Sequence, residues 1–316
     1  MNPRVTIILT IYNRTDFLPG ALESALRQTM TDFEIIVADD SGQGIAGPIC
    51  DSFHLPEKIR HQANPKNIGI ALSLQMALKS ARGDYFAILN DDDLWDPDFL
   101  ASLVPPLDQN PSAVVAFCDH WIVGPDAQRD LAATEDNTRR FGRAGLREGL
   151  VSHPAAFVIE KNGVPLAMAA LIRRKAVDPA VIVPEVTGAY DFWISCQLAA
   201  AGGGFYYVPK RLTLYRVHPA METARRRPNG FANHFYIYSQ LLDSKRFPAP
   251  ESCLKRRLGE SLLLLGRDHL YYNLLPDARG FLRRSLAQAP TLRALAGWVI
   301  SYFPKSLRIR LGLSVA

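Results

Sequence analysis

The fold is decided by the stretch Tyr85-Phe-Ala-Ile-Leu-Asn-Asp-Asp-Asp-Leu-Trp95, a short apolar run that ends in three consecutive aspartates. Apolar runs of this length are typical of strands buried on both faces of a sheet. Two similar runs precede it, Arg4-Val-Thr-Ile-Ile-Leu-Thr-Ile-Tyr12 and Glu34-Ile-Ile-Val-Ala38, and the second of these leads into Asp39-Asp40. The sequence therefore repeats one pattern, a buried strand that ends in carboxylates.

Segments with helical spacing separate these strands, at 17–28, 71–81 and 97–107, and further strands are predicted at 114–118 and 205–215. Strands that alternate with helices of this length form βαβ units. We therefore expect an α/β fold with a mostly parallel sheet flanked by helices. Such sheets bind ligands beyond the carboxyl ends of their strands. The polar stretch 120–150 is expected to be a flexible loop.

Composition limits the possible classes of protein. The 316 residues are 48% hydrophobic and 21% charged, which excludes disordered and collagen-like chains. No run of apolar residues is long enough to cross a bilayer and no secretory leader pattern opens the chain, so a cytoplasmic location is expected. Scattered cysteines without a CxxC pair exclude a zinc ribbon and favour a reducing compartment. They are Cys50, Cys118, Cys196 and Cys253.

The cluster Asn90-Asp91-Asp92-Asp93 predicts a cation site. Neighbouring carboxylates repel one another, so their packing requires a compensating positive charge. Oxygen ligands favour Mg²⁺ or Mn²⁺ over Zn²⁺. The alternative is a solvated acidic turn in which Asp93 or Asp96 caps the next helix. Because Asp39-Asp40 ends a neighbouring strand, both clusters should face one crevice, where Asp39 could accept a hydrogen bond from a nucleobase or ribose. Asp40 and Ser41 also fit simple turn chemistry.

The N-terminal two-thirds of the chain resembles the family 2 glycosyltransferases, which have the GT-A fold. Four segments carry the resemblance in order: a first strand and helix, a nucleotide-binding strand end, a DxD-like metal region, and the end of a catalytic domain. They are Val5–Arg14 with Phe17–Thr29, Phe33–Ser41, Gly83–Pro97, and Gly202–Pro219.

This resemblance implies transfer of a sugar from a nucleotide diphosphate donor, with inversion at the anomeric carbon. It assigns contacts with the nucleobase and the ribose to Thr10, Tyr12 and Asp39, and a further contact on the ribose side to Asp91. It assigns a metal ion, Mn²⁺ or Mg²⁺, to Asp92, with Asp93 and His218 as further ligands. The expected partners are a UDP- or dTDP-type sugar donor and a glycan or lipid-linked acceptor of cell-surface polysaccharide synthesis.

The catalytic base is expected at Asp191, in Gly188-Ala-Tyr-Asp-Phe-Trp193, with Glu185 as the fallback. The family often carries an acidic pair here, and in this chain that pair falls on Gly188 and Ala189. The alternative for Asp191 is a first-turn helix acid. The missing pair keeps open a non-catalytic sugar-nucleotide-binding module. A sugar nucleotidyltransferase is disfavoured because its glycine-rich first loop is absent, and no GxGxxG, Walker A, HExxH or GxSxG motif suggests another chemistry.

The C-terminal part is expected to form a second region, 221–316, that is helical, amphipathic and basic. A boundary is placed at 217–230, around an arginine-rich loop at 225–227. The net charge of the chain is +5, and residues 251–316 contribute eleven Lys or Arg against four Asp or Glu. Two interpretations stay open for this region: a helical subdomain with a solvated basic face, or, at 292–313, a segment that contacts anionic lipid at the membrane surface. Nucleic-acid binding is not expected.

Overall fold

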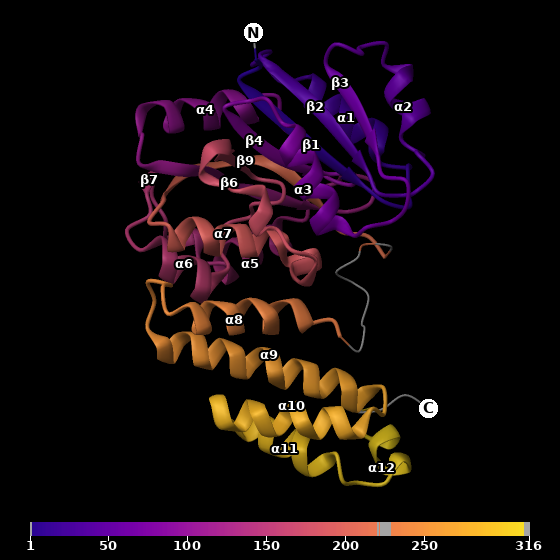
Figure 1. The fold of residues 1–316 in the computed structure, drawn as a ribbon, viewed down its shortest axis with the longest axis vertical. Coiled ribbons are helices and arrows are strands. Elements are labelled where there is room, and N and C mark those ends of the chain that lie inside the picture. The colour runs from indigo at the N-terminus through magenta and orange to yellow at the C-terminus, as the bar shows by residue number, and fades with distance from the viewer. Residues whose placement is uncertain (1, 220, 222–228, 313–316) are drawn as a thin grey trace. The chain divides into compact units, whose positions relative to one another are not determined.

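The computed structural model describes residues 2–219, 221 and 229–312, and every structural statement below refers to this part of the chain. The chain divides into two compact units, Met1–His218 and Pro219–Ala316. The first unit combines a sheet with helices, and the second is helical (Figure 1). The predicted arginine-rich loop at 225–227 lies outside the described residues.

The first unit is built on one large sheet. Its strands are, in spatial order, β3 (Ile59–Ala63), β2 (Phe33–Asp39), β1 (Val5–Ile11), β4 (Tyr85–Asn90), β8 (Ala170–Arg173), β6 (Ala113–Val123), β9 (Gly204–Arg216) and β5 (Leu94–Trp95), and β7 (Gly149–Leu150) also pairs with β9. Strands β3, β2, β1 and β4 are mutually parallel, and β6 is parallel to β9. Strand β8 runs antiparallel to both of its neighbours, so the sheet is mixed and mostly parallel, as the alternating pattern predicts.

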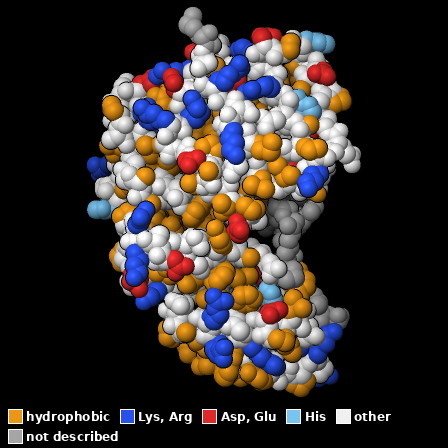
Figure 2. Space-filling view, in the orientation of Figure 1, with side chains coloured by type: hydrophobic (Ala, Val, Ile, Leu, Met, Phe, Trp, Pro, Cys, Tyr) orange, Lys and Arg blue, Asp and Glu red, His pale blue; other side chains and the backbone are white. Residues whose placement is uncertain are grey.

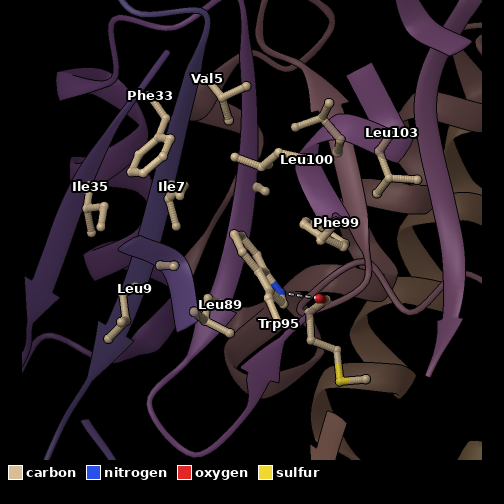
Figure 3. Packing of buried hydrophobic residues seen from close by; sticks show 14 of the residues in the cluster. Val5, Ile7, Leu9, Phe33, Ile35, Leu89, Trp95, Phe99, Leu100 and Leu103 are labelled. Carbon is tan, nitrogen blue, oxygen red and sulfur yellow. Dashed lines mark hydrogen bonds between the residues drawn. The ribbon is translucent and has the colours of Figure 1, made fainter. Parts of the chain in front are cut away.

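Helices flank the sheet in the first unit: α1 (Leu18–Leu26), α2 (Gly47–Ser52), α3 (Ile70–Ser80), α4 (Phe99–Gln109), α5 (Leu131–Arg140), α6 (Pro154–Lys161) and α7 (Tyr190–Ala200). The hydrophobic core contains side chains from both the sheet and these helices. Every residue of β1 is buried, and the Trp95 ring stacks on Phe99 at 4.2 Å between ring centroids. The Trp95 indole Nε1 donates to the Met168 carbonyl at 2.7 Å, which satisfies its one polar group (Figure 3).

The prediction of a flexible loop over 120–150 is wrong. Strand β6 continues to Val123, and α5 follows it. Helix α5 has little apolar surface because it packs on β6 through hydroxyl groups. Thr134 Oγ1 accepts from the Ile122 amide at 3.0 Å, and Thr138 donates to Asp119 at 2.6 Å. A helix that is held by such bonds does not carry the apolar period on which helix prediction depends.

The second unit contains α8 (Ala232–Ser244), α9 (Glu251–Tyr271), α10 (Leu275–Gln288), α11 (Leu292–Ile300) and α12 (Lys305–Arg310), which confirms a helical C-terminal region. Helices α9 and α10 pack closely because glycine lies at their contact. A Cβ on Gly266 would lie 2.6 Å from Leu282. Among the described residues, no helix combines the length and the apolar character needed to cross a bilayer.

Candidate active site

The strand register brings the predicted polar residues to one edge of the sheet. Strand β1 lies between β2 and β4, with Ile11 beside Asp39 and Thr10 beside Asn90. Because all three strands are parallel, their carboxyl ends meet at this edge. The acidic turn after β4 and the end of β2 therefore flank the end of β1, as the sequence pattern predicts.

Arg14 compensates the charge of the acidic turn. Its Nη2 donates to Asp91 Oδ1 at 2.9 Å and also contacts Asp92 Oδ2. Both aspartates are buried, at 8% and 9% exposed. Burial raises the pKa of Asp91 to about 6, and the charge of Asp92 adds to this shift while Arg14 opposes it. Arg14 was not predicted from the sequence. It follows the first strand closely, however, and the carboxyl ends of the parallel strands converge at that point.

Residues at and just after the end of β9 contact the same acidic turn. His218 Nε2 lies 3.1 Å from Asp92 Oδ2, and its ring packs on Phe17 at 5.1 Å between centroids. Arg216 Nε donates to the Asp92 carbonyl at 2.8 Å, and its guanidinium lies over the Phe17 ring at 4.7 Å. The structure thus brings together two of the predicted metal ligands, Asp92 and His218, which are 126 positions apart in the chain.

Asp93 faces inward. Its carboxylate is fully buried and accepts from Asn90 Nδ2 at 2.9 Å and from the Arg216 amide at 3.0 Å. Burial raises its pKa above the ordinary range, and the charge of Asp92 acts in the same direction. In this structure Asp93 attaches β9 to the turn, and its role as a second metal ligand stays a prediction.

Asp39 is also fully buried. It accepts from the amides of Ser41 and Ala46, both at 2.9 Å, and lies 3.1 Å from His61 Nε2. Burial opposes its ionisation, but these hydrogen bonds outweigh that effect and lower its pKa. Asp39 therefore orders the loop after β2, while Tyr12 is half exposed at the same edge.

Asp40 has a structural role of the kind that turn chemistry predicts. It accepts from Asn64 Nδ2 and from the amides of Ile68 and Gly69 at 2.8–2.9 Å. These bonds connect the end of β2 to the segment that enters α3. The roles of Thr10, Tyr12, Asp39 and Asp91 in nucleotide binding stay predictions.

The predicted base belongs to helix α7. Asp191 lies in the first turn of α7, and burial raises its pKa to about 6. The preceding Tyr190 is buried, and its pKa is raised by burial and by the charges of Asp191, Asp93 and Asp92. The Tyr190 hydroxyl therefore lies within electrostatic range of both the helix start and the acidic turn. Glu185, the fallback base, is exposed.

The donor set fits one divalent cation with few protein ligands. Asp92 Oδ2, which Arg14 also contacts, lies 3.1 Å from the ring nitrogen Nε2 of His218. A cation of this type commonly keeps one or two protein ligands and completes its shell with substrate phosphates. Among the described residues, no cluster of three or more His, Cys, Asp or Glu side chains is arranged to hold a metal ion. Asp92 and His218 would therefore hold the ion together with ligand oxygens.

Residues 6–162 match the family described as glycosyl transferase family 2. The chain belongs to this family. The glycosyltransferase GlyG of Streptococcus pneumoniae is 29% identical over 118 residues, 36% of this chain and 38% of that protein. An uncharacterised glycosyltransferase of Rickettsia typhi is 29% identical over 225 residues, 70% of this chain and 66% of that protein. The matched part covers 38% to 59% of the first four curated relatives.

Solved structures show that the family's GT-A fold is present. TarS residues 1–349 of S. aureus superpose with a TM-score of 0.66 at 16% identity, covering 98% of this chain and 92% of that one. The mannosyltransferase PcManGT of Pyrobaculum calidifontis, solved with GDP-Man and Mn²⁺, gives a TM-score of 0.60 at 19% identity, covering 99% and 84%. TarS has also been solved with UDP-GlcNAc. The fold expected from the resemblance is confirmed.

Proposed function

We propose that this protein is a metal-dependent, inverting, non-processive glycosyltransferase that moves a sugar from a nucleotide diphosphate donor to a hydroxyl group. The observation that carries the proposal is the contact between Asp92 and His218 beside Arg14, at the carboxyl edge of the sheet. Family relatives named as glycosyltransferases support the activity. The complexes of TarS with UDP-GlcNAc and of PcManGT with GDP-Man and Mn²⁺ support a nucleotide sugar and a divalent cation.

The proposed chemistry is a single displacement. The acceptor oxygen forms a bond to the anomeric carbon while the bond from that carbon to the diphosphate oxygen breaks. Asp191 takes the proton of the acceptor hydroxyl, which is general base catalysis. Asp92 and His218 would hold Mn²⁺ or Mg²⁺, which when bound supplies Lewis-acid stabilisation of the leaving diphosphate. Arg14 adds positive charge at the same edge, and Thr10, Tyr12, Asp39 and Asp91 would hold the nucleoside.

The donor we favour is a UDP- or dTDP-type sugar, and the acceptor is a glycan or a lipid-linked glycan of cell-surface polysaccharide synthesis. Such acceptors are extended on the cytoplasmic face of a membrane, so we propose a cytoplasmic enzyme that meets the membrane through its basic helices. The test is transfer and donor hydrolysis with Mn²⁺, in the wild type and in Asp191→Asn. Turnover in the wild type that Asp191→Asn abolishes supports the proposal.

A second candidate is a non-catalytic sugar-nucleotide-binding module. Gly188 and Ala189 favour it, because they stand where the family usually carries an acidic pair, and Gly188 is exposed with open space around it. Nucleotide-sugar binding with Mn²⁺ but no turnover with any acceptor, and no donor hydrolysis, would favour this candidate. A nucleotidyltransferase would instead form a nucleotide sugar from a sugar phosphate, which the same assay mixture detects.

A further inference from the structure

Helix α11 in the second unit buries small residues and leaves several large apolar side chains exposed. Ala294 and Ser301 are fully buried, and a Cβ on Gly297 would lie 3.2 Å from Leu282. The opposite stripe is exposed, with Leu292 at 85% and Tyr302 at 57%. A helix in a globular unit normally buries its large apolar residues and exposes its polar ones. The outward face of α11 is therefore built to meet an apolar environment.

The exposed apolar stripe continues along the chain into α12. Its members are Leu292, Leu295, Val299 and Tyr302, spaced three or four residues apart along α11 and its end, and Leu307 and Leu311 in and after α12. Contiguous apolar patches of this kind mark interaction sites or membrane contacts. Figure 2 shows apolar side chains gathered along the lower edge of the view, where Figure 1 places α11, with Lys and Arg beside them. We call this stripe the apolar face.

The charge around the apolar face has one sign. Residues 278–312 contain seven Lys or Arg and no Asp or Glu. Arg293, Lys305 and Arg310 are exposed there. A patch that combines apolar side chains with cations and lacks acids is complementary to an anionic lipid surface, which attracts each cation and accepts the apolar residues. The same charge would repel a second copy of this face.

A buried arginine gives an independent indication of an anionic ligand. Arg308 is 1% exposed, and its Nη2 donates to Asn273 Oδ1 at 2.5 Å. Its Nε and Nη1 are buried without a hydrogen-bond partner among the described residues. Burial lowers the pKa of Arg308, and the charge of Arg279 acts in the same direction. A buried guanidinium normally has its donors satisfied by an acceptor, and an anion here would supply one.

Arg279 forms the second wall of this site. Its Nη2 donates to the Ser301 carbonyl at 2.9 Å, and its guanidinium lies over the Tyr302 ring at 4.1 Å. Arg279 therefore connects the end of α11 to α10 beside Tyr302, a member of the apolar face. The anion site and the apolar face are adjacent, which is the arrangement that a lipid with a charged head group and an apolar tail requires.

We propose that α11 and α12 form a binding site for anionic lipid, in which Arg308 and Arg279 hold the phosphate of the head group and the apolar face enters the outer acyl region. This inference deepens the membrane contact of the proposed function but does not depend on catalysis. Vesicle binding tests it, and nucleotide binding by the first unit is measured separately, so failure of one is distinguishable from failure of the other.

The experiment is flotation of the full chain with phosphatidylcholine vesicles, with and without phosphatidylglycerol. We expect binding only when phosphatidylglycerol is present, and weaker binding at about 0.5 M NaCl because salt screens the cations. Val299→Asp and Arg308→Gln should each lower the binding about fivefold or more. Leu131→Asp is the matched control, because Leu131 is an exposed leucine of the first unit, at 64%. It should bind as the wild type does.

Circular dichroism shows whether Arg308→Gln folds, and Val299→Asp keeps the test decisive if it does not, because Val299 is exposed. Equal binding to neutral and anionic vesicles, or no loss of binding in Val299→Asp, would overturn the proposal. Complete release of the protein from vesicles by millimolar inorganic phosphate would also contradict it, since the apolar face would then contribute nothing. A dimer in sedimentation that Val299→Asp dissociates would assign the face to a second copy instead.

Discussion

Arg14 lets two carboxylates lie side by side at the carboxyl edge of the sheet. It contacts Asp91 and Asp92 together, and His218 approaches Asp92 from another strand. The Arg14 guanidinium is thus already held where the proposed reaction develops negative charge on a diphosphate. Groups held in advance at such a place stabilise a transition state more than mobile groups do.

Asp92→Asn tests this arrangement most simply. The amide keeps the shape of the side chain but removes the charge that Arg14 and His218 share. We expect sugar transfer to fall about 10²–10³-fold, with the Mn²⁺ concentration for half-maximal rate raised. Initial rates over a Mn²⁺ titration measure both quantities. Asp98→Asn, an exposed aspartate near the start of α4, is the matched control, and a similar loss there would contradict the assignment.

The pKa of Asp191 predicts the pH dependence of the rate. A base acts in its ionised form, and burial raises the pKa of Asp191 to about 6. We therefore expect kcat/KM, whose pH profile reports groups of the free enzyme, to fall as the pH is lowered through about 6. Asp191→Asn should be slower by about 10²–10⁴-fold and lack this limb of the profile. A wild-type profile that stays flat below pH 6, or an active Asp191→Asn, would move the base elsewhere.

Several site residues could be predicted from sequence because they end strands. Asp39, Asp91 and Asp92 follow apolar runs directly, and parallel strands bring such ends together. Arg14 follows the first strand and could have been found by the same rule, but Tyr190 could not. Tyr190 acts through its position relative to the acidic turn, which is far away in the chain. The inward orientation of Asp93 is set by its bond to the Arg216 amide, which no local pattern encodes.

Among the elements, the turn that enters β4 is tightly constrained by backbone on two sides. A Cβ on Gly83 would lie 2.5 Å from the Thr6 amide nitrogen and 2.7 Å from the Tyr85 carbonyl oxygen. Both atoms belong to backbone that cannot move without disturbing β1 or β4. We expect Gly83→Ala to lower the free energy of unfolding by about 1–3 kcal/mol. Gly145→Ala, where a Cβ meets nothing within 4 Å, is the control, and equal effects in urea unfolding would refute this account.

Glu34 at the start of β2 holds the same turn. Burial opposes its ionisation, but bonds from the Arg82 side chain and amide and from Thr6 outweigh burial and lower its pKa. In the unfolded chain Glu34 takes up its proton near the ordinary value of about 4.3. Its contribution to stability is therefore complete above about pH 5 and is lost as the pH falls through the lower folded pKa.

Glu34→Gln should remove this dependence. We expect the variant to be less stable than the wild type at pH 7, and the difference to shrink as the pH falls from about 5 toward 3. Urea unfolding at several pH values measures the difference. A gap that stays constant across this range would show that Glu34 does not gain stability from its ionised form.

The apolar strands and the amphipathic helices of the parallel half could be predicted, and α5 and β8 could not. Helix α5 is held to β6 by Thr134 and Thr138 rather than by apolar packing. Strand β8 is short, and it joins the sheet in the opposite direction between β4 and β6. Its pairing depends on strands that are distant in sequence. The hydrophobic periodicity of a segment does not indicate whether it will pair in the parallel or the antiparallel direction.

The molecule as a whole consists of an α/β unit, which carries the candidate active site, and a helical unit, which carries the basic apolar face. Each unit has its own test, because nucleotide binding concerns the first and vesicle binding the second. The charge of the chain follows the same division, since residues 219–316 carry a net charge of +10 from sixteen cations and six anions, and residues 1–218 carry −5. Anionic surfaces should therefore act on the second unit.

The most direct test of the central claim, that Asp92 and His218 hold a cation which binds a nucleotide diphosphate sugar, is the thermal unfolding midpoint with UDP-sugar and Mn²⁺. A ligand that binds only the folded state raises this midpoint in proportion to its affinity. We predict a rise in the wild type that requires both Mn²⁺ and the nucleotide sugar, and no rise in Asp92→Asn. An equal rise in Asp92→Asn, or no rise in the wild type with any nucleotide sugar, would contradict the account.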